Sequence, residues 1–394
     1  MSQTLNLPQE YDEWYDKILV AAILLLIAVG MIMVTSSSLY HAQNSLNGRT
    51  DFFVIRHMIF LSVTLVAVML VMSQPIIRWQ KYGPYLLVLG ILLLVMVLFV
   101  GRTVNGSKRW LALGPFTFQV SEAIKLFVVV YIAGYLVRRT DELQTQIKGF
   151  IKPLIVLALI TGLLLLEPDF GASVVILATS LAMLFLGGAR LWQFIGLTGA
   201  VAGILGIIAF SQPYRIKRLT AFLDPWSDPF GSGYQLTQSL IAFGRGSITG
   251  EGLGNGLQKL SYLPEAHTDF IFAVLAEEFG LIGVFCVMGL FFVFFSRTMK
   301  IGRAALMQQR PFAGYLAYGV GFWITFQALI NMGVTSGALP TKGLTLPFIS
   351  YGNNSLIICG VAVAIVLRID YETRLIEKGM MELSEAEIEE GVKS

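Results

Sequence analysis

Long apolar runs constrain the fold of this chain more than any other feature. A helix that spans a bilayer needs about 20 mainly apolar residues, and its backbone polar groups must be satisfied within the helix. Ten runs meet this length to within a few residues, at 18–38, 52–73, 84–101, 119–138, 150–167, 172–187, 191–210, 269–297, 312–337 and 349–369. The sequence therefore predicts an all-α, polytopic integral membrane protein with about ten transmembrane helices.

Composition indicates the same class. Hydrophobic residues make up 55% of the 394 residues and charged residues 13%, whereas soluble domains carry about 25% charged residues. The net charge of +3 is small and the basic residues are dispersed, which excludes an obvious nucleic-acid partner. Cys286 and Cys359 both lie in apolar runs. We interpret them as buried core thiols, because a free cysteine behaves as a small hydrophobe.

The distribution of charge in the connections predicts the orientation. Acidic residues precede the first run, so the positive region of a cleavable signal peptide is missing. Lys and Arg are concentrated in alternate connections, which places both termini in the cytoplasm. We expect a single domain over 1–394 whose end, 377–394, is an acidic cytoplasmic tail.

One connection, 211–268 between the seventh and eighth spans, is much longer than the others. It opens with the basic and apolar segment Tyr214–Leu219, which suits a membrane surface. Six glycines follow between 244 and 256, but no Gly-Lys-Ser/Thr completes a phosphate-binding loop. We expect a flexible outer loop that touches lipid headgroups, and loops of this length are usually functional or disordered.

Ionisable residues at membrane depth are functional candidates, because a lipid-facing charge costs several kcal/mol. Glu122 and Lys125 lie three residues apart near the start of the fourth span and share a helix face. The pair is either a buried ion pair that fixes helix packing or a carboxylate and cation that face an outer cavity.

The outer loop before this span carries Lys108, Arg109 and Trp110. Arginine can bind a phosphate with two hydrogen bonds, and tryptophan suits the headgroup level or a sugar face. The alternative for all three residues is interfacial anchoring. In the tight turn after the fifth span, Glu167 and Asp169 flank a proline, and we favour Asp169 as the cap of the next helix.

The most informative cluster stands at the outer mouth of the eighth span, where Glu265, His267 and Asp269 alternate along the chain. Asp269 or its neighbour Thr268 is a candidate helix cap. The functional alternative is an acid-base site, since a carboxylate in a partly dry environment can be tuned to accept a proton.

Glu277 and Glu278 lie about 12 Å further into the same span, given the rise of a helix, and need partners within the bundle. Lys342 on the last outer loop is one candidate. With only three histidines in the chain, a transition-metal site at His267 is weakly supported. No cofactor is required by the sequence, although Mg²⁺ or Mn²⁺ held loosely by carboxylates and a pyrophosphate stays open.

Four stretches carry a resemblance to a known family. They are Val-Asn-Gly-Ser-Lys-Arg-Trp at 104–110, Leu-Asp-Pro-Trp-Ser-Asp-Pro-Phe-Gly-Ser-Gly-Tyr-Gln at 223–235, Tyr-Leu-Pro-Glu-Ala-His-Thr-Asp-Phe-Ile-Phe at 262–272 and Leu-Pro-Thr-Lys-Gly-Leu-Thr-Leu-Pro-Phe-Ile-Ser-Tyr-Gly at 339–352. Together they resemble the SEDS family of shape, elongation, division and sporulation proteins, over nearly the whole chain. The likeness is greater to its cell-division branch than to its elongation branch.

The resemblance implies a peptidoglycan glycosyltransferase with ten spans. Such an enzyme polymerises lipid II into glycan strands on the outer face of the cytoplasmic membrane during septal wall synthesis, and releases undecaprenyl pyrophosphate. It also implies a class B penicillin-binding transpeptidase and other division proteins as partners. The residues that match the family's functional positions are Asp269, Arg109, Trp110, Glu122, Lys125 and Lys342.

The chain departs from the family pattern at four positions. Thr117 stands where a basic residue is common, which removes one candidate phosphate contact, and Val120 stands where proline is common. Asn353 and Asn354 replace a usual Gly-Ser pair. These departures leave the detailed substrate contacts open.

The residues fit a glycosyl transfer in which Asp269 acts as the base and Lys108, Arg109, Lys125 and Lys342 are candidates to bind the pyrophosphate. The main alternative is a lipid II flippase, for which essential charges should lie near the midplane. A non-enzymatic scaffold of the division complex is a third, weaker alternative. The position of the acid-base cluster at the outer boundary favours the enzyme.

Overall fold

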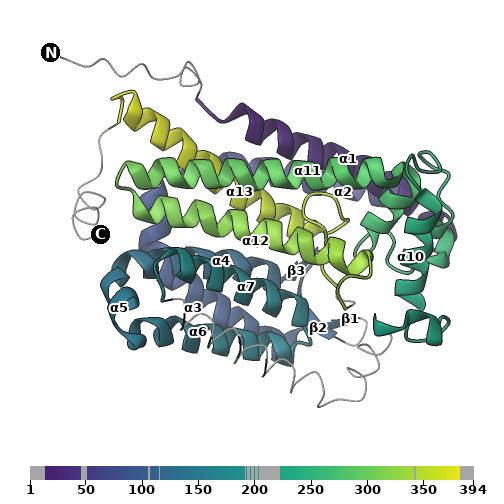
Figure 1. Cartoon of the computed structure of the whole chain (residues 1–394), viewed down its shortest axis with the longest axis horizontal. Coiled ribbons are helices and arrows are strands. Elements are labelled where there is room, and N and C mark those ends of the chain that lie inside the picture. The colour runs from purple at the N-terminus through teal and green to yellow at the C-terminus, as the bar shows by residue number, and fades with distance from the viewer. Residues whose placement is uncertain are drawn as a thin grey trace.

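The computed structural model in Figure 1 describes residues 14–45, 51–104, 107–114, 116–190, 222–340 and 343–381, with four isolated positions between 191 and 221. Nine of the ten predicted spans correspond to described helices. These are α1 (Lys17–Ser45), α2 (Phe52–Met72), α3 (Ile76–Val100), α4 (Val120–Arg138), α6 (Ile147–Leu166), α7 (Phe170–Leu186), α11 (Ile271–Met307), α12 (Pro311–Thr335) and α13 (Asn353–Glu377).

Seven of these helices, all but α7 and α13, are long and apolar enough to cross a membrane, and α7 is a shorter apolar helix. The short helix α5 (Thr140–Thr145) connects α4 to α6. The seventh predicted span, 191–210, lies almost wholly outside the described residues, as do Tyr214–Leu219, Lys342 and the tail beyond 381. The prediction of a helical membrane protein is confirmed, and the single-domain assignment stays a prediction.

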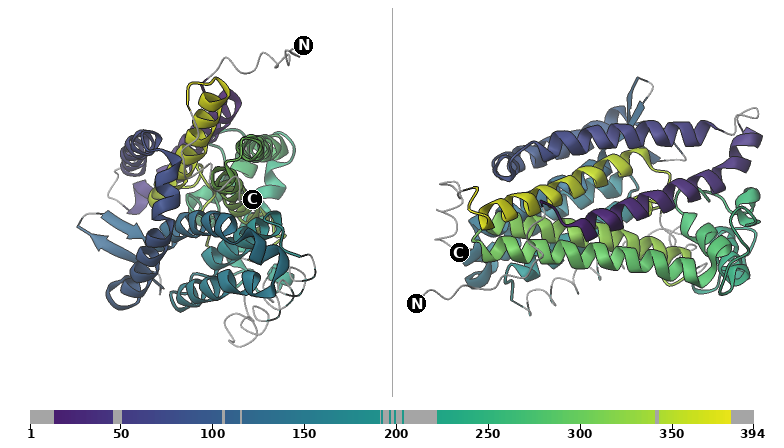
Figure 2. Two further views of the ribbon diagram at one scale, coloured as in Figure 1. Left: turned by 90° about the vertical axis from the view of Figure 1, so that its left-hand side faces the viewer. Right: turned by 90° about the horizontal axis from the view of Figure 1, so that it is seen from above.

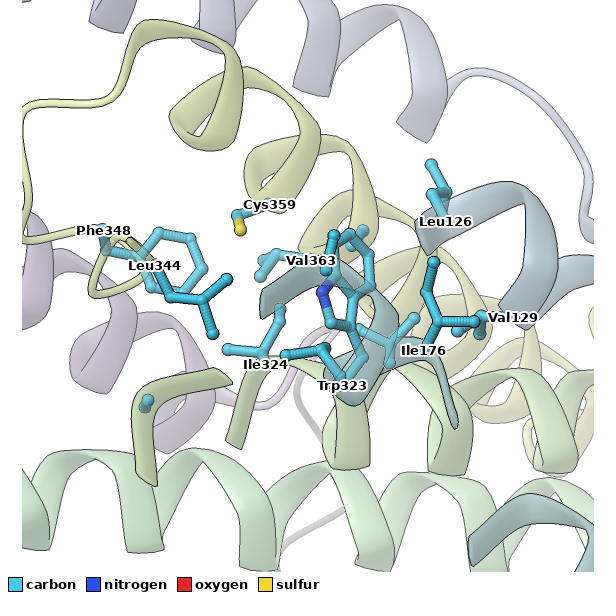
Figure 3. Close-up of a cluster of buried hydrophobic side chains, with 14 of the residues drawn as sticks. Leu126, Val129, Ile176, Trp323, Ile324, Leu344, Phe348, Cys359 and Val363 are labelled. Atoms are coloured by element: carbon cyan, nitrogen blue, oxygen red, sulfur yellow. The ribbon is translucent and has the colours of Figure 1, made fainter. Parts of the chain in front are cut away.

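The helices run side by side, with α4 and α12 inside the bundle and α2 at its edge (Figure 2). α4 packs against α3, α7 and α12, whereas α2 packs mainly against α13. Figure 3 shows part of the core, where Trp323 and Ile324 of α12 meet Ile176 of α7 and Val363 of α13. Such a core positions the loops between the helices rigidly, because protein interiors are close-packed.

The two cysteines differ in their surroundings. Cys359 on α13 is fully buried, as the sequence predicted, but Cys286 on α11 is exposed. The prediction for Cys286 is therefore wrong. Apolar runs in a membrane helix cover both the core face and the lipid-facing surface, so an apolar neighbourhood in sequence does not separate the two.

A small antiparallel sheet follows α3, with the order β1 (Arg102–Val104), β2 (Ser107–Leu113) and β3 (Phe116–Gln119). Trp110 in the central strand pairs with Arg102 on one side and Gln119 on the other. The sheet projects from the side of the bundle (Figure 2). The sequence did not predict this sheet, which is a small addition to a mainly helical fold. Its strands are too short for alternation to be distinguished from a loop in the sequence.

The described part of the long connection is compact rather than flexible. It contains the 3₁₀ turn Pro225–Ser227, α10 (Tyr234–Gly246) and the π-helical turn Gln258–Tyr262. A Cβ atom at Gly246 would lie 1.9 Å from the carbonyl oxygen of Ala276, and one at Gly250 would lie 2.2 Å from that of Glu278. The glycines therefore allow the loop backbone to pack directly on α11, which corrects the expectation of flexibility for the described part of the loop. Its contact with lipid headgroups stays a prediction.

α11 itself changes direction where this loop reaches it. Gly280 has φ 63° and ψ −162°, a conformation that a residue with a side chain rarely adopts. The backbone nitrogens of Leu281 and Ile282 donate to the carbonyls of Ser247 and Ile248, at 3.0 and 3.2 Å. At the break in the helix, carbonyls of the loop therefore accept hydrogen bonds from the backbone nitrogens of α11.

We call the end of the bundle that carries the sheet, α10 and the turn 264–270 the loop end, on the right in Figure 1. α1 begins and α13 ends at the opposite end. There the Asp16 carboxylate forms an ion pair with Arg297, and the Asp16 backbone nitrogen donates to Asp370 at 2.7 Å. Charges at this opposite end are therefore used to join helices.

Candidate functional site

Asp269 lies in a tight turn, 264–270, immediately before α11. Glu265 in this turn has φ 56°, and its carbonyl oxygen accepts hydrogen bonds from the backbone nitrogens of Thr268 and Phe270, at 3.1 and 3.2 Å. The Thr268 hydroxyl also donates to the Glu265 carboxylate at 2.7 Å. The turn is therefore held by hydrogen bonds to Glu265, and Asp269 follows within it.

The connection between α12 and α13, residues 336–352, holds this turn in place. The backbone nitrogen of Tyr351 donates to the carbonyl of His267 at 2.9 Å, and the Ser350 hydroxyl donates to that of Thr268 at 2.6 Å. A Cβ atom at Gly343 would lie 3.0 Å from Oδ2 of Asp269. The α12–α13 loop and the Asp269 carboxylate are therefore in close contact.

The pKa of the Asp269 carboxyl differs from that of an ordinary aspartate. The residue is half-buried, and the hydrogen bond that it accepts from a described side chain, that of Asn331, reaches its backbone carbonyl rather than its carboxylate. Its pKa is raised to about 7, mainly because burial disfavours the charged form, with Glu265 and Asp169 adding to the rise and Arg109 opposing it. A carboxylate with this pKa can accept a proton near neutral pH.

Arg109 on β2 joins the sheet to the turn between α6 and α7. Its guanidinium donates to the carbonyl oxygen of Glu167 at 3.3 Å and to that of Pro168. The same cation opposes the rise in the pKa values of both Asp269 and Glu167. Arg109 is therefore anchored by backbone contacts while its charge acts on the acidic groups around it.

The acidic turn between α6 and α7 completes this cluster. Asp169 caps α7 by accepting a hydrogen bond from the backbone nitrogen of Ala172 at 3.1 Å, which confirms the capping prediction. Glu167 is fully buried and neither carboxyl oxygen has a hydrogen-bond partner among the described residues. Burial and the nearby Asp169 raise its pKa to about 8, against the opposing charge of Arg109.

The Glu122 and Lys125 pair lies inside the bundle. The ammonium of Lys125, which is 1% exposed, donates to Glu122 at 2.8 Å and to the side-chain oxygen of Gln327 on α12 at 2.7 Å. The Trp323 indole donates to the same oxygen at 3.2 Å. This geometry favours the ion pair that fixes helix packing over a cation that faces an open cavity.

The remaining predicted residues are distributed around the loop end. The His267 ring packs against the rings of Phe53 and Tyr351, with centroids 5.1 and 5.8 Å away. Lys108 is exposed on β2 and Trp110 is half-buried. Lys342 lies outside the described residues, although its neighbour Gly343 approaches Asp269.

One of the departures from the family pattern contacts another. The side-chain amide of Asn354, at the start of α13, donates to the backbone carbonyl of Thr117 on β3 at 3.0 Å. Thr117 thus supplies a backbone anchor for the sheet. No local pattern predicts this contact, because the two residues are far apart along the chain.

Glu277 and Glu278 have partners that sequence reasoning missed. Arg245 of α10 lies 3.1 Å from Glu277, whose carboxylate also accepts from the backbone nitrogens of Leu257 and Gln258. Glu278 accepts from the ammonium of Lys259 in the long connection, and from Ser36 of α1 at 2.7 Å. The two carboxylates therefore fasten the long connection to α11.

A metal site receives no support within the part of the chain that the structure describes. No group of three or more His, Cys, Asp or Glu residues there is arranged to hold a metal ion. The chemistry available at the loop end is that of a tuned carboxylate, a neighbouring guanidinium and backbone donors.

Comparison with known proteins identifies relatives over almost the whole chain. The family model described as "Cell cycle protein", for FtsW, RodA and SpoVE, matches residues 16–375. A probable peptidoglycan glycosyltransferase FtsW of Alteromonas naphthalenivorans is 54% identical over 369 residues, 93% of this chain and 71% of the relative. One from Coxiella burnetii is 51% identical over 375 residues, 95% of this chain and all of the relative.

Solved structures share the fold. A chain from a peptidoglycan synthase complex that coordinates polymerization and crosslinking matches with a TM-score of 0.75 and 26% identity, covering 91% of this chain and 98% of its own length. The rod shape determining protein RodA of Thermus thermophilus matches with a TM-score of 0.67 and 26% identity, covering 92% and 98%.

Proposed function

The chain belongs to the FtsW, RodA and SpoVE family of cell cycle proteins, and on that premise we propose that it is a peptidoglycan glycosyltransferase that polymerises lipid II. The observation that carries the proposal is the Asp269 carboxylate, which has a raised pKa and no described hydrogen-bond donor, beside the Arg109 cation at the loop end. A base next to a cation is what transfer from a lipid-linked pyrophosphate requires.

In the proposed reaction, a sugar hydroxyl oxygen of the acceptor attacks the anomeric carbon of the donor. A new glycosidic bond forms as the bond to the pyrophosphate oxygen breaks, and Asp269 takes the hydroxyl proton. A single displacement of this kind inverts the anomeric centre. Arg109, Lys108 and Lys342 stabilise the negative charge of the departing undecaprenyl pyrophosphate, and Trp110 binds a sugar face. The buried Lys125 does not contact the pyrophosphate in this reaction.

The pKa of Asp269 sets the expected pH dependence. A base must be deprotonated, so the rate should fall as the pH drops through about 7, the raised pKa of Asp269. A rate that stays level down to the ordinary range of an aspartate would contradict the role of this carboxylate as the base.

A lipid II flippase is the alternative. Transport requires charged sites near the midplane with access from both sides. The Glu122 and Lys125 pair is enclosed by Gln327 and Trp323, and the tuned carboxylate lies in a turn outside α11. These positions favour chemistry at one membrane face over passage through the bundle.

We place the loop end on the outer face of the bacterial cytoplasmic membrane, at the division septum, with both termini in the cytoplasm. Support comes from the concentration of Lys and Arg in the predicted inner connections and from the FtsW relatives. The peptidoglycan synthase complex that this fold resembles coordinates polymerization with crosslinking. This supports a class B penicillin-binding transpeptidase as a partner, together with other division proteins. A divalent cation bound with the substrate pyrophosphate is part of the proposal to be tested.

The test measures glycan strands made from lipid II by the purified chain, with and without its transpeptidase and with and without Mg²⁺ or Mn²⁺. Asp269→Ala should abolish polymerisation, whereas Glu251→Ala, which removes an exposed carboxylate on the same connection, should not. Full synthesis by Asp269→Ala would overturn the assignment. Movement of labelled lipid between leaflets, without polymer, would establish the flippase instead.

A further inference from the structure

α12 presents two buried amide side chains to the loop end. Gln327 and Asn331 are four residues apart and therefore lie on one face of the helix. Gln327 is fully buried and Asn331 is 1% exposed. Both donate to backbone carbonyls outside their own helix, which distinguishes them from residues that only fill space.

Asn331 bridges the two segments that meet at the site. Its Nδ2 donates to the carbonyl oxygen of Asp269 at 2.8 Å and to that of Leu344 at 2.6 Å. Because both carbonyls are drawn to one amide nitrogen, the turn 264–270 and the α12–α13 loop cannot move apart without losing a buried hydrogen bond. Leaving such a group unsatisfied is unfavourable, because its desolvation is then not compensated by a hydrogen bond.

Gln327 also holds the α12–α13 loop, and the orientation of its amide group is set by Lys125 and Trp323. Its side-chain oxygen accepts from Lys125 at 2.7 Å and from the Trp323 indole at 3.2 Å. Lysine and tryptophan can only donate, so they select the amide oxygen and turn the Nε2 group towards Thr345. That group donates to the carbonyl of Thr345 at 3.0 Å.

We propose that Asn331 and Gln327 are positioning residues that hold the Asp269 turn against the α12–α13 loop, and that Lys125 acts through Gln327 rather than on the substrate. The inference rests on the proposed function, because it deepens the account of the same site. α12 is a packed helix of the core, so it provides a rigid reference for both segments.

The chemical consequence lies in the surroundings of the Asp269 carboxylate. Glu265 of its own turn, Asp169 of the α6–α7 turn and Arg109 of β2 act on its charge, and Gly343 of the α12–α13 loop packs against it. A displacement of about 1 Å is enough to reduce a rate about 100-fold. Loss of the hydrogen bonds of Asn331 or Gln327 should therefore both misplace the Asp269 carboxylate and expose it to water.

The experiment compares Asn331→Leu, which removes both donors at similar volume, with Gln308→Leu. Gln308 donates to the carbonyl of Thr373 at 3.0 Å at the opposite end of the bundle, so the control removes a similar amide contact far from the site. Asn331→Leu should lower kcat for lipid II polymerisation by about 10- to 100-fold with little change in KM. The acidic limb of its pH profile should move to lower pH, because a hydrated carboxyl loses its proton more easily. Gln308→Leu should change neither.

Two further variants keep the test decisive if Asn331→Leu does not fold. Gln327→Met and Lys125→Met should lower kcat and shift the pH limb in the same direction as Asn331→Leu. If the acidic limb of the pH profile is unshifted in every variant that folds, the proposal is overturned. A merely structural defect would reduce the fraction of active enzyme without moving that limb. A raised KM for Lys125→Met with unchanged kcat would show that Lys125 binds substrate. Failure of the proposed function is separate, because the unsubstituted chain would then make no Asp269-dependent polymer.

Discussion

Glu167 provides the sharpest test of the electrostatics at the loop end. It directly follows α6, is fully buried, and has no hydrogen-bond partner for either oxygen among the described residues. Burial and the neighbouring Asp169 raise its pKa from 4.5 to about 8, despite the opposing charge of Arg109. The substitution Glu167→Gln keeps the shape of the protonated acid and removes its titration.

The sign and size of the effect follow from linkage. The folded state binds the Glu167 proton more tightly than the unfolded state, so the carboxyl lowers the free energy of unfolding as the pH rises above about 4.5, and the loss levels off above about 8. The difference between a pKa of 4.5 and one of about 8 corresponds to at most about 5 kcal/mol, and to about 3 kcal/mol at pH 7. Glu167→Gln should therefore be the more stable protein at neutral and basic pH.

Thermal unfolding of both proteins in detergent, followed between about pH 5 and pH 9, measures this difference. The two midpoints should lie close together at the acidic end and separate as the pH rises, with Glu167→Gln the higher. Glu251→Gln, at an exposed position, is the control and should follow the parent at every pH. Parallel curves for Glu167→Gln and the parent would refute the buried, protonated state of this carboxyl.

Three other substitutions test the rest of the loop end. Arg109→Ala should reduce polymerisation at least about tenfold, because the cation and the anchor of the sheet are both lost. Arg102→Ala, at an exposed position of β1, is the control and should have little effect. Equal losses in the two variants would contradict a specific role for Arg109. Glu278→Gln leaves the buried Lys259 ammonium without its counter-charge, and should lower the free energy of unfolding by about 3–5 kcal/mol in a detergent unfolding assay; an unchanged midpoint would count against the pair. Gly280→Ala places a Cβ atom 2.4 Å from the backbone nitrogen of Gly250 and from the carbonyl oxygen of Ile248, at φ 63°. The thermal midpoint of this variant should fall by several degrees. A variant as stable as the parent would show that the break in α11 is not required.

The helices were predictable because hydropathy is a local property of the sequence. Nine predicted spans correspond to described helices, and the cap at Asp169 followed from the proline between two acidic residues. Helix ends were less predictable. α3 begins at Ile76 rather than near 84, because Pro84 is accommodated within the helix, and α11 continues to Met307 despite its basic residues.

The site was only partly predictable, because its geometry depends on contacts between distant segments. The sequence singled out Asp269 and Arg109, but it gave no indication that Arg109 is held by the backbone of the α6–α7 turn. It also left Lys125 open between a buried ion pair with Glu122 and a contact with the substrate pyrophosphate. Gln327, which binds the Lys125 ammonium, is an uncharged residue in an apolar run, and no local pattern distinguishes it from its neighbours.

The surroundings of Asp269 have a consequence for biosynthesis. Arg109, Asp169 and Gly343, which act on or touch its carboxylate, come from widely separated stretches of the chain. The α12–α13 loop is synthesised near the end, after every other part of the site. A nascent chain that has not yet inserted α12 therefore lacks the Asn331 hydrogen bond to the Asp269 turn and the approach of Gly343 to its carboxylate. We therefore expect the acid-base role of Asp269 to require the assembled bundle.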